Sequence, residues 1–78
     1  MSLFALWPEP LSREQEAVAN SVIALDPSIT RREANRVARR PRTKKSRAAL
    51  ARALSGSVYF GEWHHVQVLK DFSERALR

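Results

Sequence analysis

Start and stop signals for short helices constrain the fold of this chain more than any other feature. Two pairs of residues have the spacing of a capping box, Ser12 with Gln15 and Thr30 with Glu33. In a capping box the two side chains satisfy free backbone N–H groups at the start of a helix. Pro27 and Pro41 follow the two pairs, and proline cannot continue a helix because it lacks the N–H group. These signals predict helices over residues 12–25 and 30–39.

Apolar residues recur at helical spacing within both segments. Val18, Val22 and Leu25 share one face of the first segment. Ala19 and Ile23 widen that face. The second segment has a narrower apolar stripe, formed by Ala34, Val37 and Ala38. Each predicted helix therefore has one face to bury against the rest of the chain.

A third helix is predicted over residues 43–54. This segment contains a run of small and aliphatic residues, Ala48, Ala49, Leu50, Ala51, Ala53 and Leu54. Ser55-Gly56 follows the run, and glycine is typical of the residue that ends a helix. We therefore expect the third helix to stop before Gly56.

Residues 57–68 allow two interpretations. Helical spacing predicts a fourth helix over residues 62–77, with one apolar face formed by Trp63, Val66, Leu69, Phe72 and Ala76. The stretch SVYFGEWHHVQV also reads as two β-rich runs around Gly61-Glu62, which has the composition of a two-residue hairpin turn. We favour the helix and keep the hairpin as the alternative.

Together these elements predict an all-α fold, a compact domain of three to four helices over residues 12–78. The alternative is a winged-helix-like fold, with a C-terminal β-hairpin in place of the fourth helix. Residues 1–11 contain two prolines and are expected to form an extended apolar arm, which either packs on the core or docks in a partner's groove. The chain has eleven alanines, which bury little area, so a homodimer or a partner would help complete the core. We expect the aromatic residues to supply bulk to that core, namely Trp7, Tyr59, Phe60, Trp63 and Phe72.

Positive charge is concentrated in one block, residues 31–52. The block holds ten of the fourteen basic residues and one acid, Glu33, for a net charge of +9. Residues 1–30 carry a net charge of −3, and residues 53–78 are neutral. Eight of the ten cations are arginine, whose planar guanidinium binds a phosphate or a guanine edge through two parallel hydrogen bonds. Like charges at this density repel one another, so we expect the block to bind an external polyanion.

The order of helices around this block resembles a helix-turn-helix DNA-binding module over residues 11–54. The resemblance runs from LSREQEAVANSVIAL to SRAALARAL, and the apolar stripe of the 30–39 segment matches the first helix of the motif. In an ungapped alignment Arg39, Lys44 and Arg47 occupy positions where the family has apolar residues. A longer turn would bring Ala48 and Leu50 to those positions instead. The resemblance implies that the 43–54 helix enters the major groove while the 30–39 helix crosses the DNA backbone.

From this resemblance and the charge block we predict nine nucleic-acid-binding residues. Backbone contacts are expected from the second helix, through Arg31, Arg32 and Arg36. Arg39, Arg40 and Arg42 flank the turn. Lys44, Lys45 and Arg47 enter or border the groove. Arg47 is the predicted base contact, because it lies one turn into the third helix. Lys44 and Lys45 stand at a helix start, where the helix macrodipole favours acidic side chains, so an external anion would stabilise them.

Two functions from different classes follow. The first is a small basic DNA-binding protein that regulates transcription, with RNA as an alternative polyanion. The second is a phage- or plasmid-type interaction protein that inhibits a host protein by occupying an acidic or nucleic-acid-binding groove. The apolar arm discriminates between them, because its deletion should abolish only the second function.

Other classes of function lack the residues that they require. The chain has no cysteine, and His64 and His65 are adjacent, so they point to different sides of a helix or strand and cannot easily chelate one metal ion. The acids are scattered and no glycine-rich phosphate loop is present, so we predict neither an enzyme nor a cofactor. The longest apolar run near the N-terminus, Leu3 to Trp7, is too short for a signal peptide or a membrane span. We therefore expect a cytoplasmic protein that does not contact membranes.

Overall fold

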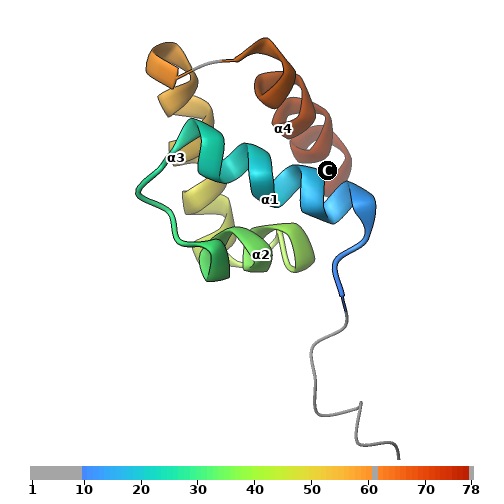
Figure 1. The fold of residues 1–78 in the computed structure, drawn as a ribbon. Coiled ribbons are helices and arrows are strands. Elements are labelled where there is room, and N and C mark those ends of the chain that lie inside the picture. The colour runs from blue at the N-terminus through green and yellow to red at the C-terminus, as the bar shows by residue number, and fades with distance from the viewer. Residues whose placement is uncertain (1–9, 61, 78) are drawn as a thin grey trace, which may run out of the picture.

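The structure is a computed structural model, and it contains four helices. It describes the backbone of residues 10–60 and 62–77, and the side chains of these residues apart from 57–60. The helices are α1 (Arg13–Leu25), α2 (Arg31–Arg39), α3 (Lys44–Phe60) and α4 (Trp63–Ala76), as Figure 1 shows. The described residues include no strand. The predicted all-α fold is confirmed, and the hairpin alternative is wrong because residues 57–60 continue α3.

Helix α1 is the centre of the domain. It packs against α2, α3 and α4, which lie around it (Figure 1). The core consists of buried side chains from all four helices and from the loop between α1 and α2, with Leu25, Leu50 and Leu69 the largest of those fully enclosed. Many of the other members are alanine and valine, so the helices approach one another closely.

The local signals at the helix starts are confirmed. The Ser12 hydroxyl accepts a hydrogen bond from the Gln15 N–H (3.1 Å), and the Gln15 side chain accepts one from the Ser12 N–H (2.9 Å). At α2 the Thr30 hydroxyl accepts from the Glu33 N–H (3.1 Å), which is one half of the predicted box. At α3 the Thr43 hydroxyl accepts from the Ser46 N–H (3.1 Å). Pro27 and Pro41 lie in the turns that follow α1 and α2.

The predicted end of the third helix is wrong. Helix α3 continues past Gly56 to Phe60. Gly56 instead allows α3 to pass close to the end of α1, since a Cβ atom at this position would lie 2.4 Å from the Leu25 carbonyl oxygen. The glycine therefore serves a packing contact between two helices, and it has no positive φ angle of the kind that ends a helix.

The expectation that the aromatic residues form core is only partly met. Phe72 is buried on α4, as is the predicted core residue Leu69. Ala76, another predicted core residue, is half-buried. Trp63 is 73% exposed at the first position of α4, so its assignment to the core is wrong. The side chains of Tyr59 and Phe60, and the predicted arm up to residue 9, lie outside the described residues.

None of the helices in the described part of the chain has both the length and the apolar composition needed to cross a membrane.

Candidate nucleic-acid interface

One hollow on the surface brings most of the basic block together. Its volume is about 890 Å³. We call it the basic hollow, and its lining consists of seven cations and two neutral polar residues, Arg31, Arg32, Asn35, Arg36, Arg39, Arg40, Thr43, Lys44 and Lys45. No acidic residue is among them. The hollow therefore offers a concave surface of one sign of charge.

Helix α2 supplies one wall of the hollow as a stripe of arginines. Arg32, Arg36 and Arg39 are spaced at i, i+4 and i+7, which places them on one face of the helix. All three are exposed, whereas Ala34, Val37 and Ala38 on the opposite face are buried. The apolar stripe that anchors α2 to the core thus orients the arginine stripe toward solvent.

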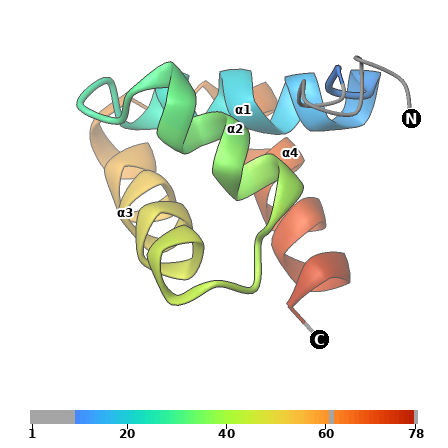
Figure 2. The same cartoon turned by 90° about the horizontal axis from the view of Figure 1, so that it is seen from below.

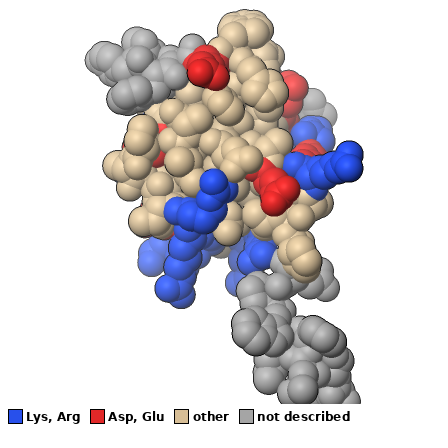
Figure 3. Space-filling model, in the orientation of Figure 1, with Lys and Arg blue, Asp and Glu red and all other residues tan. Residues whose placement is uncertain are grey.

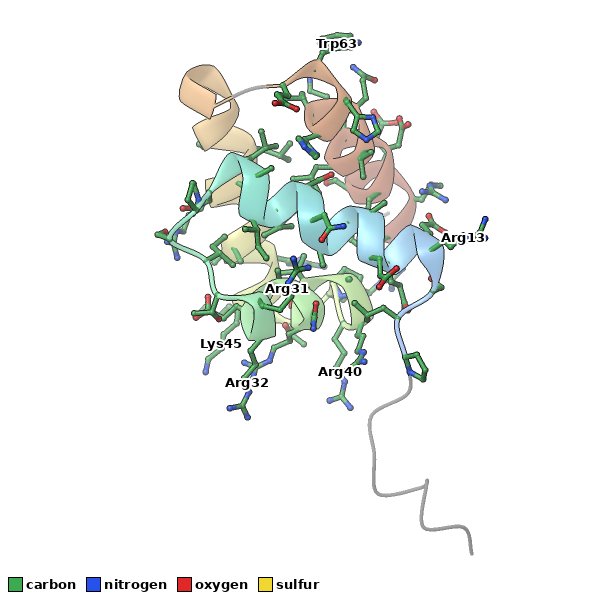
Figure 4. All side chains as sticks on the ribbon, in the orientation of Figure 1. Arg13, Arg31, Arg32, Arg40, Lys45 and Trp63 are labelled. Carbon is green, nitrogen blue, oxygen red and sulfur yellow. The ribbon has the colours of Figure 1, made fainter. Side chains whose placement is uncertain are left out.

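The turn and the first residues of α3 supply the other wall. Arg40 and Thr43 come from the four-residue turn, and Lys44 and Lys45 open α3. Seen from below, the turn lies between α2 and the start of α3 (Figure 2). Arg32, Arg40 and Lys45 project from the same lower edge of the molecule, away from the core (Figure 4). Cations from α2, the turn and the start of α3 therefore share one surface.

Three ion pairs among the described residues lie outside the basic hollow. They join Asp26 to Arg52 (3.3 Å), Glu62 to His65 (3.6 Å), and Glu14 to Arg75. Lys and Arg gather at the lower edge of the face shown in Figure 3, whereas at its right side they are mixed with acidic residues. These three carboxylates therefore pair with cations that do not line the hollow.

Two of the nine predicted site residues do not line the hollow. The Arg42 Nε donates a hydrogen bond to the carbonyl oxygen of Ala76 (3.0 Å), which ties the turn to the C-terminal end of α4. A cation suits this place, because the last carbonyls of a helix carry partial negative charge. Arg47, the predicted base contact, is exposed on α3 outside the hollow lining. The other seven predicted residues all line it.

Helix α3 contacts the core through one buried stripe. Ser46, Ala49, Leu50 and Ala53 are the buried residues of its described part. Leu50 lies in this stripe, whereas Ala48 is exposed. The buried Ser46 hydroxyl accepts a hydrogen bond from the Thr43 hydroxyl (2.9 Å), which satisfies this polar group in the buried stripe.

Asn35 is a lining residue that the sequence reasoning missed. Its Oδ1 is buried and has no hydrogen-bond partner among the described residues. A buried acceptor without a donor is destabilising, and asparagine is also a poor residue for a helix interior. The sequence did contain a signal for this residue. Asn35 lies among the arginines of α2, at a helix position where asparagine does not increase helix stability.

Replacing Asn35 by alanine is expected to stabilise the protein by about 1 kcal/mol, because it removes an unsatisfied acceptor and raises helix propensity. Urea denaturation followed by circular dichroism measures the change. Asn20→Ala on α1 is the matched control, since the Asn20 Oδ1 already accepts a hydrogen bond from Arg31 (2.8 Å). If both substitutions changed the free energy of unfolding equally, the Asn35 Oδ1 would not be an unsatisfied buried acceptor.

Arg52 belongs to the basic block but has an internal role. Its guanidinium pairs with Asp26 and donates to the Ser28 hydroxyl (3.0 Å), which ties α3 to the loop between α1 and α2. Since the side chain is 59% exposed, Arg52→Ala should lower stability by less than about 1 kcal/mol. If the basic hollow binds DNA, the same substitution should change the affinity by less than about twofold, because Arg52 does not line the hollow. A fall in affinity equal to that of Arg36→Ala, measured by fluorescence anisotropy, would place Arg52 in the interface.

The two histidines have different environments. His65 is half-buried, and its Nδ1 shares a hydrogen bond with the hydroxyl of the buried Ser21 (3.0 Å), which links α4 to α1. His64 is exposed. Within residues 10–60 and 62–77, no three His, Cys, Asp or Glu side chains are placed to hold a metal ion.

Comparison with known proteins identifies no relative, since no family model, no curated protein and no solved structure matches the chain.

Proposed function

We propose that this protein binds nucleic acid, with duplex DNA as the first candidate, through the basic hollow. The observation that carries the proposal is the convergence of seven cations from α2, the turn and the start of α3 on one concave surface, which none of the described carboxylates lines. Phosphates supply most of the affinity of such surfaces, because each neutralised phosphate releases a condensed counterion. Five of the seven are arginines, which bind phosphate with bidentate geometry.

The arrangement of α1, α2 and α3 resembles that of helix-turn-helix modules, which supports the proposal of DNA binding. Four residues, 40–43, connect the two helices, and helix-turn-helix modules use a connection of about three to four residues. Helix α1 packs against both of them, as the additional helix of such modules does. Regulation of transcription is the role that this resemblance implies.

Salt-dependent binding to a labelled duplex of mixed sequence tests the proposal. If about six of the seven cations meet phosphates, the logarithm of affinity should fall with the logarithm of salt with a slope of about −5. This slope corresponds to a loss of roughly 10³-fold between about 50 and 200 mM salt. The protein must first be treated with nuclease, and a duplex RNA measured in parallel decides between the two polyanions. No binding to either at about 50 mM salt would remove the proposal.

Inhibition of a host protein is the second candidate function, and Trp63 favours it. Tryptophan is enriched among residues that dominate protein interfaces, and Trp63 is exposed at the end of the molecule opposite Arg32 and Arg40 (Figure 4). Size-exclusion chromatography with and without nuclease separates the candidates. A purified complex with one defined protein that survives nuclease and is lost in Trp63→Ala would support the second function. Deletion of residues 2–7 should abolish this complex and leave DNA affinity intact.

A further inference from the structure

We infer that α3 meets duplex DNA with its N-terminal turn and not along its length, so that the phosphate backbone supplies nearly all of the affinity and base sequence contributes little. This inference rests on the proposed function and specifies how the same site is used. It differs from the docking implied by the helix-turn-helix resemblance, in which the third helix lies in the major groove.

The direction of α3 relative to the basic hollow is the first observation. Lys44 and Lys45, at the start of α3, are the only lining residues that come from the described part of this helix. From this end α3 runs away from α2 toward the upper edge of the molecule, as Figure 1 shows. At a rise of about 1.5 Å per residue, Ala51 lies about 10 Å further along the helix than Lys44. A polyanion seated in the hollow therefore touches the first turn and not the later ones.

The outward face of α3 is the second observation. At about 100° of rotation per residue, one exposed face carries Lys44, Ala48, Ala51 and Ser55. Beyond the first turn this face offers two methyl groups and one hydroxyl. Selective base contacts come mainly from the longer side chains of Arg, Lys, Asn and Gln. Arg47 lies at one edge of this face, and Lys45 and the hollow lie toward the opposite edge.

The arginine stripe of α2 is the third observation. Arg32, Arg36 and Arg39 are separated by about 6 Å and 4.5 Å along the helix axis. They form a row of cations suited to successive phosphates, which have the same chemistry in every sequence. We therefore expect the best and the average duplex of equal length to differ in affinity by less than about tenfold, whereas sequence-specific proteins reach roughly 10³-fold or more.

Introducing a negative charge at two places tests the direction of α3. Arg32→Glu should weaken binding to a mixed-sequence duplex by at least roughly tenfold, because it reverses a charge in the hollow. Ala51→Glu should weaken binding by no more than about threefold, since the substituted side chain stays away from the DNA. His64→Glu, on the exposed start of α4, gives the effect of one distant negative charge, and Ala51→Gln gives the effect of size alone. Circular dichroism and melting temperature check that each variant is folded.

The outcomes separate this inference from the function on which it rests. If Ala51→Glu weakens binding as much as Arg32→Glu while Ala51→Gln and His64→Glu do not, α3 lies along the DNA and the inference is wrong. Selection of binding sites from random duplexes gives a second measurement. Enrichment of one sequence that binds more than about 100-fold better than the pool would also overturn it. A wild-type protein that binds no duplex would overturn both this inference and the proposed function.

Discussion

Replacing Arg32 and Arg36 together by alanine is expected to weaken binding to duplex DNA by roughly tenfold or more at about 100 mM salt. It should also reduce the salt slope by about 1.8, since each lost phosphate contact contributes about 0.9. Both side chains are exposed on the outward face of α2, so their loss removes charge from the basic hollow without opening the core. Fluorescence anisotropy across a salt series gives both quantities.

The matched control is Arg13→Ala with Lys70→Ala, which removes the same charge from α1 and α4. Both residues are exposed and neither lines the hollow, and Figure 4 shows Arg13 at the start of α1, away from the lower edge. This control should change affinity by less than about threefold through long-range attraction alone. If the two double variants weaken binding equally, net charge and not the hollow determines affinity.

Replacing Gly56 by alanine is expected to lower the free energy of unfolding by about 2 kcal/mol. Helix propensity alone predicts the opposite sign, since alanine is about 1 kcal/mol better than glycine inside a helix. The added Cβ would lie 2.4 Å from the Leu25 carbonyl oxygen, so α1 and α3 would have to separate. Forcing atoms into a packed interior typically costs about 1–3 kcal/mol. A domain of this size has a total stability of about 4–12 kcal/mol, so the loss is a substantial part of it.

Ser55→Ala is the control for Gly56→Ala, because Ser55 is exposed on the same helix and the substitution raises helix propensity without a steric contact. It should leave stability unchanged or raise it by a few tenths of a kcal/mol. Urea denaturation measures both variants. A Gly56→Ala protein that is more stable than the wild type would show that α1 and α3 do not approach as closely as described.

Local chemistry made the helix starts and most helix bounds predictable from the sequence. The capping residues Ser12 and Thr30 act through hydrogen bonds to backbone groups three residues away, and Pro27 and Pro41 act on their own backbone. The apolar spacing of α4 likewise identified Val66, Leu69 and Phe72 as buried. These signals depend on neighbours in the sequence, so they need no knowledge of the tertiary structure.

Contacts between distant residues explain the errors. Gly56 has the composition of a helix stop, but its role depends on the Leu25 carbonyl in another helix. Trp63 fits the apolar spacing of α4, yet it lies one turn beyond the part of the helix that the core covers and is exposed. Neither fact can be obtained from periodicity, because both depend on how α1, α3 and α4 are placed relative to one another.

The candidate site was predictable in composition but not in detail. Charge density identified the seven cations that line the basic hollow. It could not identify Arg42 and Arg52 as residues with internal partners, because the Ala76 carbonyl and Asp26 lie far away in the sequence. The unsatisfied Asn35 was missed for a similar reason, since the lack of a donor near its Oδ1 depends on the surrounding tertiary structure.

The central position of α1 has a consequence for mutagenesis of this protein. α1 contacts both helices that carry the hollow, while its own buried residues, such as Val18 and Val22, carry no charge. If the protein binds DNA as proposed, a genetic screen scored only by loss of that binding will recover α1 substitutions that act by unfolding the domain. The protease resistance of each variant protein would distinguish substitutions that unfold the domain from those that remove a contact residue.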